Sequence, residues 1–309
     1  MELIRGIHNI RPVHRGCVAT IGVFDGVHRG HQVILEQVKN KAKELGLPSV
    51  VMVFEPHPQE FFSPDNAPAR LMRFREKFQA MAAMGVDRVV CLQFNKSLSR
   101  LLAQEFIDIV LVNGLGVKHL VVGDDFHFGS DRQGEYQMLV EAGKKYGFMV
   151  THTDTFELYG ERVSSTRLRA ALEHDDFELA TELLGRPYSM KGRVVYGRQL
   201  GRQLGVPTAN LLVARAKLPI KGVFAVNVVV KGTSHEGVAN LGVKPTLGGT
   251  KPLLEAHLFN FDGNLYGLPM EVVFRHKIRD EKKFDSLDDL KNAIANDTIA
   301  AQEFFLQLK

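Results

Sequence analysis

Hydrophobic positions follow two different patterns along the chain, and the change between them falls near residue 185. Before it, apolar runs that predict buried strands alternate with stretches whose apolar residues recur every three or four positions, as in an amphipathic helix. Strands that alternate with helices indicate a parallel, doubly wound sheet. The expected strands are 18–24, 49–54, 88–94, 119–123 and 148–152, and the expected helices are 30–45, 74–84, 103–112 and 134–146.

After that change, short β-rich runs dominate and turn residues such as Asp262-Gly263-Asn264 separate them. This pattern predicts a small antiparallel β-barrel or a β-sandwich, and we expect the barrel. A capping serine, Ser286, precedes an apolar pattern that predicts one or two helices packed on the barrel. The fold class is therefore α/β, with a Rossmann-like domain over residues 1–185 and a barrel domain with a terminal helix over residues 186–309. The expected barrel strands are 190–196, 223–231, 234–241, 253–259 and 270–278.

Composition limits the classes of protein that fit these patterns. The chain has 309 residues, 45% hydrophobic and 24% charged, which is ordinary for a globular protein long enough for two domains. No apolar run approaches the ~20 residues of a membrane helix, and the N-terminus lacks a signal-peptide core. Cys17 and Cys91 lie in apolar runs, so we expect buried free thiols and a cytoplasmic location. A net charge of +4 without a Lys/Arg run favours small anionic substrates over nucleic acid.

The stretch 20–32 carries the clearest chemistry, because it predicts a strand, a glycine turn and the start of a helix. A helix N-terminus presents free N–H groups and a positive dipole end, which suit phosphate. His28 and His31 are three apart there, so their imidazoles share a face. Two such histidines could also be a surface coincidence or half of a metal site. The stretch matches neither the Walker A pattern nor G-x-G-x-x-G.

Three further polar stretches follow expected strands, at 55–58, 123–129 and 164–169. Ligands of open parallel sheets bind where the strands end. In the last stretch, Ser165 and Thr166 are candidate helix caps, and Arg167 with Arg169 could add a second phosphate contact.

The second half has three candidate sites of its own. The loop 197–210 is dense in glycine and arginine, which fits either a phosphate cradle or a flexible hairpin loop. Glu255 lies inside an apolar strand, where it is either an outward-facing residue or a base at a cleft. Arg279 and Phe284 belong either to a solvated charge run or to a segment that closes over a ligand.

The motifs of the first half resemble those of a known family. His28-Arg29-Gly30-His31 resembles the HxGH motif of nucleotidylyltransferases, and the string 22–32 is similar to that of bacterial FAD synthetases. Residues 164–169 resemble the partner signature SSTxxR, and residues 123–129 resemble GxDFxFG. The resemblance implies catalysis by His28 and His31. It implies ATP binding by Gly22, Phe24, Asp25, His28, His31, Ser165, Thr166, Arg167 and Arg169, and FMN binding by Pro56, His57, Asp125 and Phe126.

The second half resembles riboflavin kinases. Residues 201–210 match GRxLGFPTAN with Val206 in place of Phe, residues 237–246 resemble GVANIGxxPT, and residues 255–267 resemble ExHLFxFxxDLYG with Asn264 in place of Asp. The resemblance implies that Glu255 is the catalytic base and that Thr208 and Asn210 bind Mg²⁺. It implies ATP binding by Gly192, Arg202, Gly205, Pro207, Thr208 and Asn210, and flavin binding by Glu255, Arg279 and Phe284.

The chain is identified from these motifs as a member of the prokaryotic bifunctional riboflavin kinase and FMN adenylyltransferase (FAD synthetase) family. That resemblance implies that ATP phosphorylates riboflavin to FMN and that a second ATP adenylylates FMN to FAD with release of pyrophosphate. The expected partners are these small molecules, with no nucleic acid and no membrane, and the oligomeric state is left open. Two alternatives stay open: a nucleotidylyltransferase for another phosphate-bearing substrate, and a flavin-responsive binding protein without catalysis.

Overall fold

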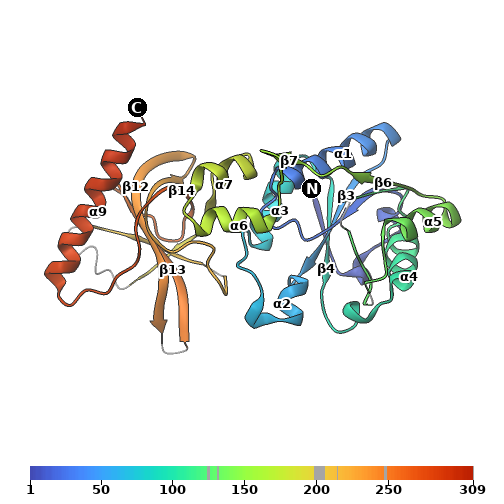
Figure 1. The fold of residues 1–309 in the computed structure, drawn as a ribbon, viewed down its shortest axis with the longest axis horizontal. Helices are drawn as coiled ribbons and strands as arrows, with labels where there is room; N and C mark the ends of the chain where they lie inside the picture. The colour runs from blue at the N-terminus through green and yellow to red at the C-terminus, as the bar shows by residue number, and fades with distance from the viewer. Residues whose placement is uncertain (124–125, 131, 198–205, 214, 247–248, 309) are drawn as a thin grey trace. The chain divides into compact units, whose positions relative to one another are not determined.

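The computed structural model describes residues 1–123, 126–130, 132–197, 206–213, 215–246 and 249–308. The chain divides into two compact units (Figure 1). The first comprises Met1–Pro68 and Phe74–Ser165, and the second comprises Ala69–Arg73 and Thr166–Lys309. The functional boundary that the sequence predicts between residues 185 and 186 stays a prediction.

A six-stranded sheet forms the centre of the first unit, and all of its strand pairs are parallel. Its strand order is β1-β4-β3-β2-β5-β6, which confirms the predicted doubly wound architecture. The strands are β1 (Glu2–Arg5), β2 (Val18–Ile21), β3 (Ser49–Glu55), β4 (Arg88–Gln93), β5 (His119–Gly123) and β6 (Met149–Thr153). The helices of this unit are α1 (Arg29–Leu45), α2 (Pro58–Phe62), α3 (Phe74–Ala83), α4 (Ala103–Phe106), η5 (Ile107–Gly114) and α5 (Tyr136–Tyr146). Short elements complete it: η1 (Ile7–Asn9), η2 (Pro12–His14), η3 (Pro64–Asn66), η4 (Leu98–Arg100), β7 (Glu157–Leu158) and β8 (Glu161–Arg162).

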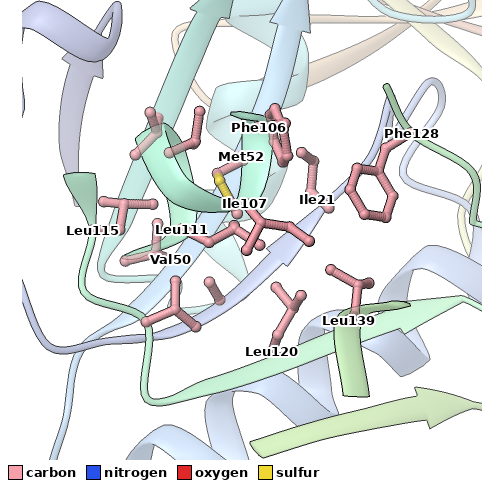
Figure 2. Packing of buried hydrophobic residues seen from close by; sticks show 14 of the residues in the cluster. Ile21, Val50, Met52, Phe106, Ile107, Leu111, Leu115, Leu120, Phe128 and Leu139 are labelled. Carbon is pink, nitrogen blue, oxygen red and sulfur yellow. The ribbon is translucent and has the colours of Figure 1, made fainter. Parts of the chain in front are cut away.

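The sheet is covered on both faces because successive side chains of a strand point to opposite sides. Val18 and Val121 pack with Val38 and Ala42 of α1 on one face. The other face holds the larger core, in which Figure 2 shows side chains of α4, η5 and α5 against those of β2, β3 and β5. Labelled members of that core are Ile21, Val50, Met52, Phe106, Ile107, Leu111, Leu115, Leu120, Phe128 and Leu139.

Two local predictions in this unit are wrong in detail. The strand expected to reach Phe24 ends at Ile21, because the residues that follow form a turn with left-handed backbone. The single helix expected over 103–112 is a short α-helix, α4, that continues as the π-helix η5. The apolar spacing there agrees with either winding, so the sequence could not tell them apart.

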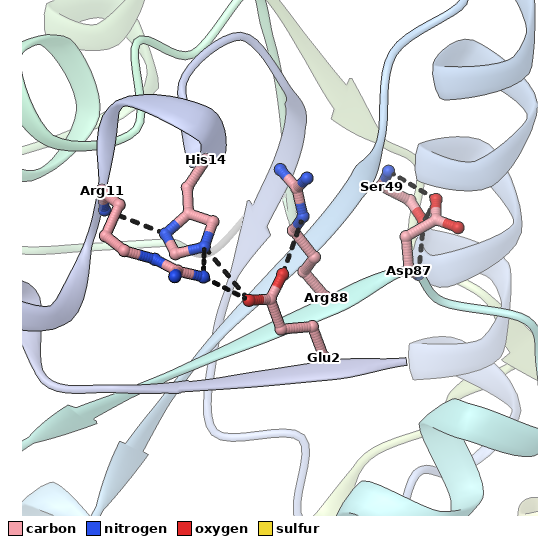
Figure 3. A network of polar contacts seen from close by, with 6 residues as sticks. All are labelled: Glu2, Arg11, His14, Ser49, Asp87 and Arg88. Atoms are coloured by element: carbon pink, nitrogen blue, oxygen red, sulfur yellow. Dashed lines mark hydrogen bonds and ion pairs between the residues drawn. The ribbon is translucent and has the colours of Figure 1, made fainter.

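The edge strand β1, which the sequence analysis missed, is held by the polar network of Figure 3. The Glu2 carboxylate accepts hydrogen bonds from His14 Nε2 at 3.1 Å and Arg11 at 3.3 Å, and it pairs with Arg88 Nε at 3.4 Å. The N–H of Arg11 donates to His14 Nδ1 at 2.9 Å, so the proton of the neutral ring lies on Nε2 and donates to Glu2. Glu2 is 41% exposed, so each pair contributes little and the network acts mainly to fix the register.

A closed antiparallel barrel forms most of the second unit, with strand order β10-β13-β12-β11-β14-β9. The predicted antiparallel barrel is thereby confirmed, with one strand more than expected. The additional strand β10 holds Ala209 and Asn210, which the sequence analysis placed in a loop. The elements are β9 (Ser189–Val195), β10 (Ala209–Leu212), β11 (Gly222–Val230), β12 (Thr233–Thr246), β13 (Gly249–Leu258), β14 (Pro269–Arg279), α6 (Ser165–Glu173), α7 (Phe177–Leu184) and α9 (Leu287–Gln307).

Helices from both ends of this unit pack on the barrel. The terminal helix α9 is one continuous helix, and its Ala301 and Phe305 pack on Val223 and Val238. On α7, Phe177 contacts the barrel residue Phe224 edge-on, with ring centroids 5.8 Å apart. Just before α7, Asp175 accepts a hydrogen bond from Lys277 of β14 at 2.8 Å. These contacts make α7 part of the barrel's packing although it precedes residue 185.

This packing predicts that a fragment of residues 166–309 is more stable than a fragment of residues 186–309. Removing α7 exposes Phe224, which is fully buried in the intact unit. Loss of one large aromatic contact of this kind costs about 3–5 kcal/mol. Urea unfolding of both fragments, followed by circular dichroism, measures the difference. Equal midpoints would show that α7 does not stabilise the barrel.

Candidate functional sites

The turn after β2 lies at the point where the strand connections of the sheet change direction. The chain passes from β2 through β3 to β4 on one side, whereas β5 and β6 lie on the other side. In such sheets, ligands bind beyond the carboxyl ends of the strands at this switch point. The loop that follows β5 begins at the same edge of the sheet. Its Asp125, a predicted FMN-binding residue, lies outside the described residues.

Three residues with left-handed backbone shape the segment before His28. Phe24, Gly26 and Val27 have φ values of 51°, 88° and 44°. A left-handed conformation costs about 1–2 kcal/mol at a residue that carries a side chain, and strain of this kind concentrates at functional sites. Ser165 Oγ donates a hydrogen bond to the Asp25 carbonyl oxygen at 2.8 Å, and thus braces the turn.

His28 is the N-cap of α1 and orients the second histidine. Its Nδ1 accepts a hydrogen bond from the backbone N–H of His31 at 3.3 Å, so the proton of the neutral ring lies on Nε2. The two imidazoles stack, with centroids 3.6 Å apart and planes at 18°. A Cβ at Gly30 would lie 3.1 Å from the Val163 carbonyl oxygen and 3.3 Å from the His28 ring, which explains the glycine between them.

His31 is held in its neutral form. Burial is the main cause that lowers its pKa well below the usual value of 6.5, and the charges of His28, Lys77 and Arg162 add to the effect. Its Nδ1 is buried and has no hydrogen-bond partner among the described residues. Lys77 is also buried, and its ammonium group donates to the Val23 carbonyl oxygen within the same turn. The site therefore offers a neutral His31 imidazole beside a buried cation.

An aromatic cavity of about 310 Å³ opens in the same unit beside the ends of β3 and β5. Six phenylalanines line it, and the rings of Phe126 and Phe128 stack with centroids 5.4 Å apart. His57 caps α2, the helix that carries Phe62, by accepting a hydrogen bond from Gln59 N at 3.0 Å. The aromatic residues that line the cavity are Phe54, Phe62, Phe94, Phe106, Phe126 and Phe128.

The remaining predicted ATP contacts of this half lie in the second unit. Helix α6 contains Thr166, Arg167 and Arg169. Ser165 is the first residue of this helix, so it is not a cap that precedes the helix. Arg169 Nε donates to the Ala69 carbonyl oxygen at 2.7 Å, so this arginine also holds a backbone segment. Their contact with a triphosphate stays a prediction.

Strand register in the barrel brings three polar residues side by side. Glu255 on β13 pairs directly with Asn210 on β10 and with Asn240 on β12. Residues directly opposite each other in antiparallel strands point to the same face, with Cβ atoms about 4.5–5.5 Å apart. The alternate residues Leu211, Leu241 and Leu254 are buried in the opposite face, inside the barrel. Asn210, Glu255 and Asn240 therefore form one polar row on the outer face.

A cavity of about 160 Å³ contains the middle of this row, and we call it the Glu255 cavity. Predicted flavin-binding residues Arg279 and Phe284 both line it, with the arginine carbon 5.6 Å from the ring centroid. Arg279 forms a two-pronged ion pair with Asp297 of α9, with both N···O distances 2.7 Å. Its other lining residues are Val206, Thr208, Val223, Val238, Asn240, His257, Glu281, Lys282, Leu290 and Ile294.

A second, larger cavity of about 600 Å³ adjoins the first, and we call it the Asn210 cavity. Thr208 lines both cavities, so they meet at this residue. His257 Nδ1 donates to the Pro207 carbonyl oxygen at 2.8 Å and thereby fixes the segment that carries Thr208. Its lining residues are Val194, Pro207, Thr208, Ala209, Asn210, Leu258, Phe261, Asp262, Gly263, Asn264, Leu265 and Tyr266.

Three predicted ATP-binding residues of the barrel fall elsewhere. Arg202 and Gly205 lie outside the described residues. Gly192 packs against Leu211, where a Cβ would approach the leucine to 3.1 Å, and it lines neither cavity. A role for these three residues in ATP binding stays a prediction.

The candidate metal ligands, Thr208 and Asn210, are both oxygen donors. No group of three or more His, Cys, Asp or Glu side chains is placed to hold a metal ion within the described ranges. Thr208 and Asn210 offer neutral oxygen atoms, which suit a hard ion that phosphates also bind. No helix among the described residues is long and apolar enough to cross a membrane.

Comparison with known families finds a separate match for each half of the chain. A family model described as FAD synthetase matches residues 10–167, and one described as riboflavin kinase matches residues 184–305. Together they define a two-domain transferase of phosphoryl and nucleotidyl groups.

Relatives that align with nearly the full chain identify the family. The chain is 55% identical to the bifunctional riboflavin kinase/FMN adenylyltransferase of Pseudomonas fluorescens, over 98% of this chain and 97% of that protein. It is 50% identical to the protein of that name from Escherichia coli K12, over 99% of this chain and 98% of that protein. The chain belongs to the bifunctional riboflavin kinase/FMN adenylyltransferase family, and ATP, FMN and FAD follow as co-substrate and products.

A solved structure supports the fold over the whole length. A protein from Streptococcus pneumoniae described as a macrolide-efflux protein is 30% identical, with a TM-score of 0.79 over 96% of this chain and 97% of that one. The riboflavin kinase match and the full-length relatives argue against both alternatives that the sequence left open.

Several residues of the two sites were missed from the sequence. The walls of the aromatic cavity come from four separate segments, so no local motif contains them. Asn240 and His257 lie within quoted motifs, but only the strand register shows that they line the Glu255 cavity. Asp297 lies in the terminal helix, where its spacing gave no signal of an ion pair with Arg279.

We predict that His31 stays neutral at pH values where an ordinary histidine takes up a proton. Because its pKa in the folded protein is lowered, the unfolded chain protonates first as the pH falls. The free energy of unfolding is therefore unaffected by His31 above about pH 6.5, and it falls as the pH drops below that value. NMR titration of labelled imidazoles, with His31→Asn to assign the signal, should show no transition of this ring near pH 6.5. A transition there would contradict the buried, neutral assignment.

Proposed function

We propose that the two reactions occur at separate sites, with the kinase reaction where the two barrel cavities meet and adenylyl transfer at the histidine turn. The observation that carries this proposal is the position of Thr208, which lines both the Glu255 cavity and the Asn210 cavity. A phosphoryl transferase needs two adjoining sites whose common wall holds the group in transfer. The barrel provides that arrangement.

In the kinase reaction, riboflavin occupies the more apolar Glu255 cavity and ATP occupies the Asn210 cavity. The 5′-oxygen of riboflavin forms a bond to the γ-phosphorus as the bond from that phosphorus to ADP breaks. Glu255 takes the hydroxyl proton, since a neutral alcohol is a weak nucleophile. Arg279, fixed by Asp297, presents its planar guanidinium beside Phe284 at the other end of the cavity.

Thr208 and Asn210 would hold Mg²⁺ together with the ATP phosphates. Both are neutral oxygen donors, which suits an ion that keeps several waters and shares its coordination with phosphate oxygens. The ion supplies neutralisation of phosphate charge when it is bound. The Asn210 amide lies close to the backbone of Gly197, where an added Cβ would come within 2.5 Å of it. The glycine leaves room for this amide.

In the adenylyl transfer, the flavin ring of FMN stacks in the aromatic cavity and ATP lies against the N-terminus of α1. The FMN phosphate is already ionised, so no protein base is needed. Its oxygen forms a bond to the α-phosphorus as the bond to pyrophosphate breaks. His28 donates through Nε2–H to the phosphate oxygens on which negative charge grows. The lowered pKa of His31 keeps the second imidazole neutral beside it.

A cytoplasmic location is also part of this proposal. Its support is the state of the cysteines: Cys17 and Cys91 are both free thiols. Burial raises the pKa of Cys17 to about 12, so it stays an unreactive thiol. Free structural thiols suit a reducing compartment.

We predict that Glu255→Gln removes the kinase reaction and spares adenylyl transfer. The variant keeps the size of the side chain but lacks its basicity, which should lower the rate of FMN formation by roughly a hundredfold or more. The assay supplies either riboflavin or FMN with ATP and magnesium. Glu236→Gln is a matched control, because Glu236 also lies half-buried on a barrel strand but lines neither cavity. A wild-type rate on riboflavin would exclude Glu255 as the base.

The double variant His28→Ala, His31→Ala gives the reciprocal result in the same assay. Loss of one such donor typically costs ~3 kcal/mol, about a hundredfold in rate, so FMN should accumulate while FAD formation stops. Each variant should keep the reaction that the other loses, and the retained reaction shows that the protein has folded. Near-normal FAD formation in the double variant would show that the imidazoles do not contact the reacting phosphates.

A further inference from the structure

Asn240 is the one member of the polar row that the reaction scheme above leaves without a role. It pairs with Glu255 on one side and with Val223 on the other, and all three line the Glu255 cavity. Its side-chain oxygen is buried and has no hydrogen-bond partner among the described residues.

An unpaired buried carbonyl oxygen is unfavourable in the free protein, because it has lost its hydrogen bonds to water and gained none. Buried polar atoms are paired in the great majority of cases. An apolar side chain at this position would pack beside its cross-strand neighbour Val223 without that penalty. The asparagine therefore makes sense if a ligand supplies the missing donor.

The chemistry of the oxygen restricts what the ligand group can be. The side-chain carbonyl oxygen of Asn240 accepts hydrogen bonds and cannot donate them. The phosphate oxygens of ATP are acceptors as well, so they cannot be its partner. A hydroxyl group is a suitable partner, and so is a ring N–H. Distance selects between these two: Asn240 is the direct cross-strand neighbour of Glu255, with Cβ atoms about 5 Å apart. Glu255 contacts the terminal hydroxyl, so only groups a few bonds from it are within reach.

We propose that Asn240 accepts a hydrogen bond from a hydroxyl of the ribityl chain of riboflavin and so selects a flavin that carries its polyol. The assignment rests on the proposed function, because it uses Glu255 to locate the end of the chain. Asn240 binds the chain beside the reacting hydroxyl, while Arg279 and Phe284 line the part of the cavity nearer α9. This contact holds in both the substrate complex and the transition state, so it affects binding more than turnover.

The test uses Asn240→Leu and Asn240→Ser in the full-length protein, with FMN formation as the readout so that only the barrel site is observed. In the leucine variant, the KM for riboflavin should rise about tenfold, which is the usual effect of one lost hydrogen bond. The kcat and the KM for ATP should change less than twofold. Serine keeps an acceptor oxygen, so its KM should lie between those of leucine and wild type.

Lumiflavin, which keeps the ring N–H but lacks the ribityl chain, identifies the part of the flavin involved. As an inhibitor of FMN formation it should have the same inhibition constant with wild type and with Asn240→Leu. An equal loss for lumiflavin and riboflavin would overturn the proposal in favour of a ring contact. An unchanged KM for riboflavin in the leucine variant would overturn it outright.

Thermal melting separates a binding role from a structural one. Replacing an unpaired buried amide by leucine should leave the melting temperature of the free protein unchanged or raise it. Asn227→Ala is the control, since Asn227 is a half-buried strand asparagine that lines neither cavity. A lowered melting temperature in Asn240→Leu together with a raised KM for both substrates would overturn the proposal. If Glu255→Gln forms FMN normally, the proposed function fails instead, independently of these results.

Discussion

Backbone pairing between strands decides which side chains can act together in this chain. In the barrel, the register of three neighbouring strands brings Asn210, Glu255 and Asn240 to one face. A shift of one residue would turn this row toward the interior, where the alternating leucines now pack. In the first unit, parallel pairing places β2 beside β5 at the switch point, so the histidine turn and the loop after β5 start from one edge.

The two sites use different physical means for related chemistry. The histidine turn stores strain in its left-handed residues, and burial keeps its His31 imidazole neutral. The barrel site instead places the Glu255 carboxylate in a cavity that shares Thr208 with a second cavity. The proposed nucleophiles account for this difference: an ionised phosphate needs charge stabilised at the leaving group, and a neutral alcohol needs a base as well.

The sequence predicted the parts of the structure that local patterns encode. Apolar alternation located most strands, and the capping serine Ser286 located α9 correctly. Strand β1 was missed because it is four residues long and pairs with β4, which lies far along the chain. Strand β10 was missed because glycine-rich sequence precedes it.

The candidate sites show the same limit more sharply. The motifs named His28, His31, Thr208, Asn210 and Glu255, all of which lie at the turn or in the cavities. They did not name Asn240, because the importance of that residue depends on its pairing with Glu255 fifteen positions away. Of the aromatic walls they named only Phe126, because phenylalanine in a strand or helix is ordinary core composition until the fold leaves a cavity beside it.

The most direct measurement of the central claim is a time course of flavin products from the full-length protein with riboflavin, ATP and magnesium, resolved by chromatography. Two separate sites acting in series predict that FMN appears first without a lag, and that FAD follows with a lag as FMN becomes available. When FMN replaces riboflavin, FAD should form without a lag. Riboflavin that stays unchanged would contradict the account. So would a double histidine variant that forms FAD from riboflavin as fast as the wild type does.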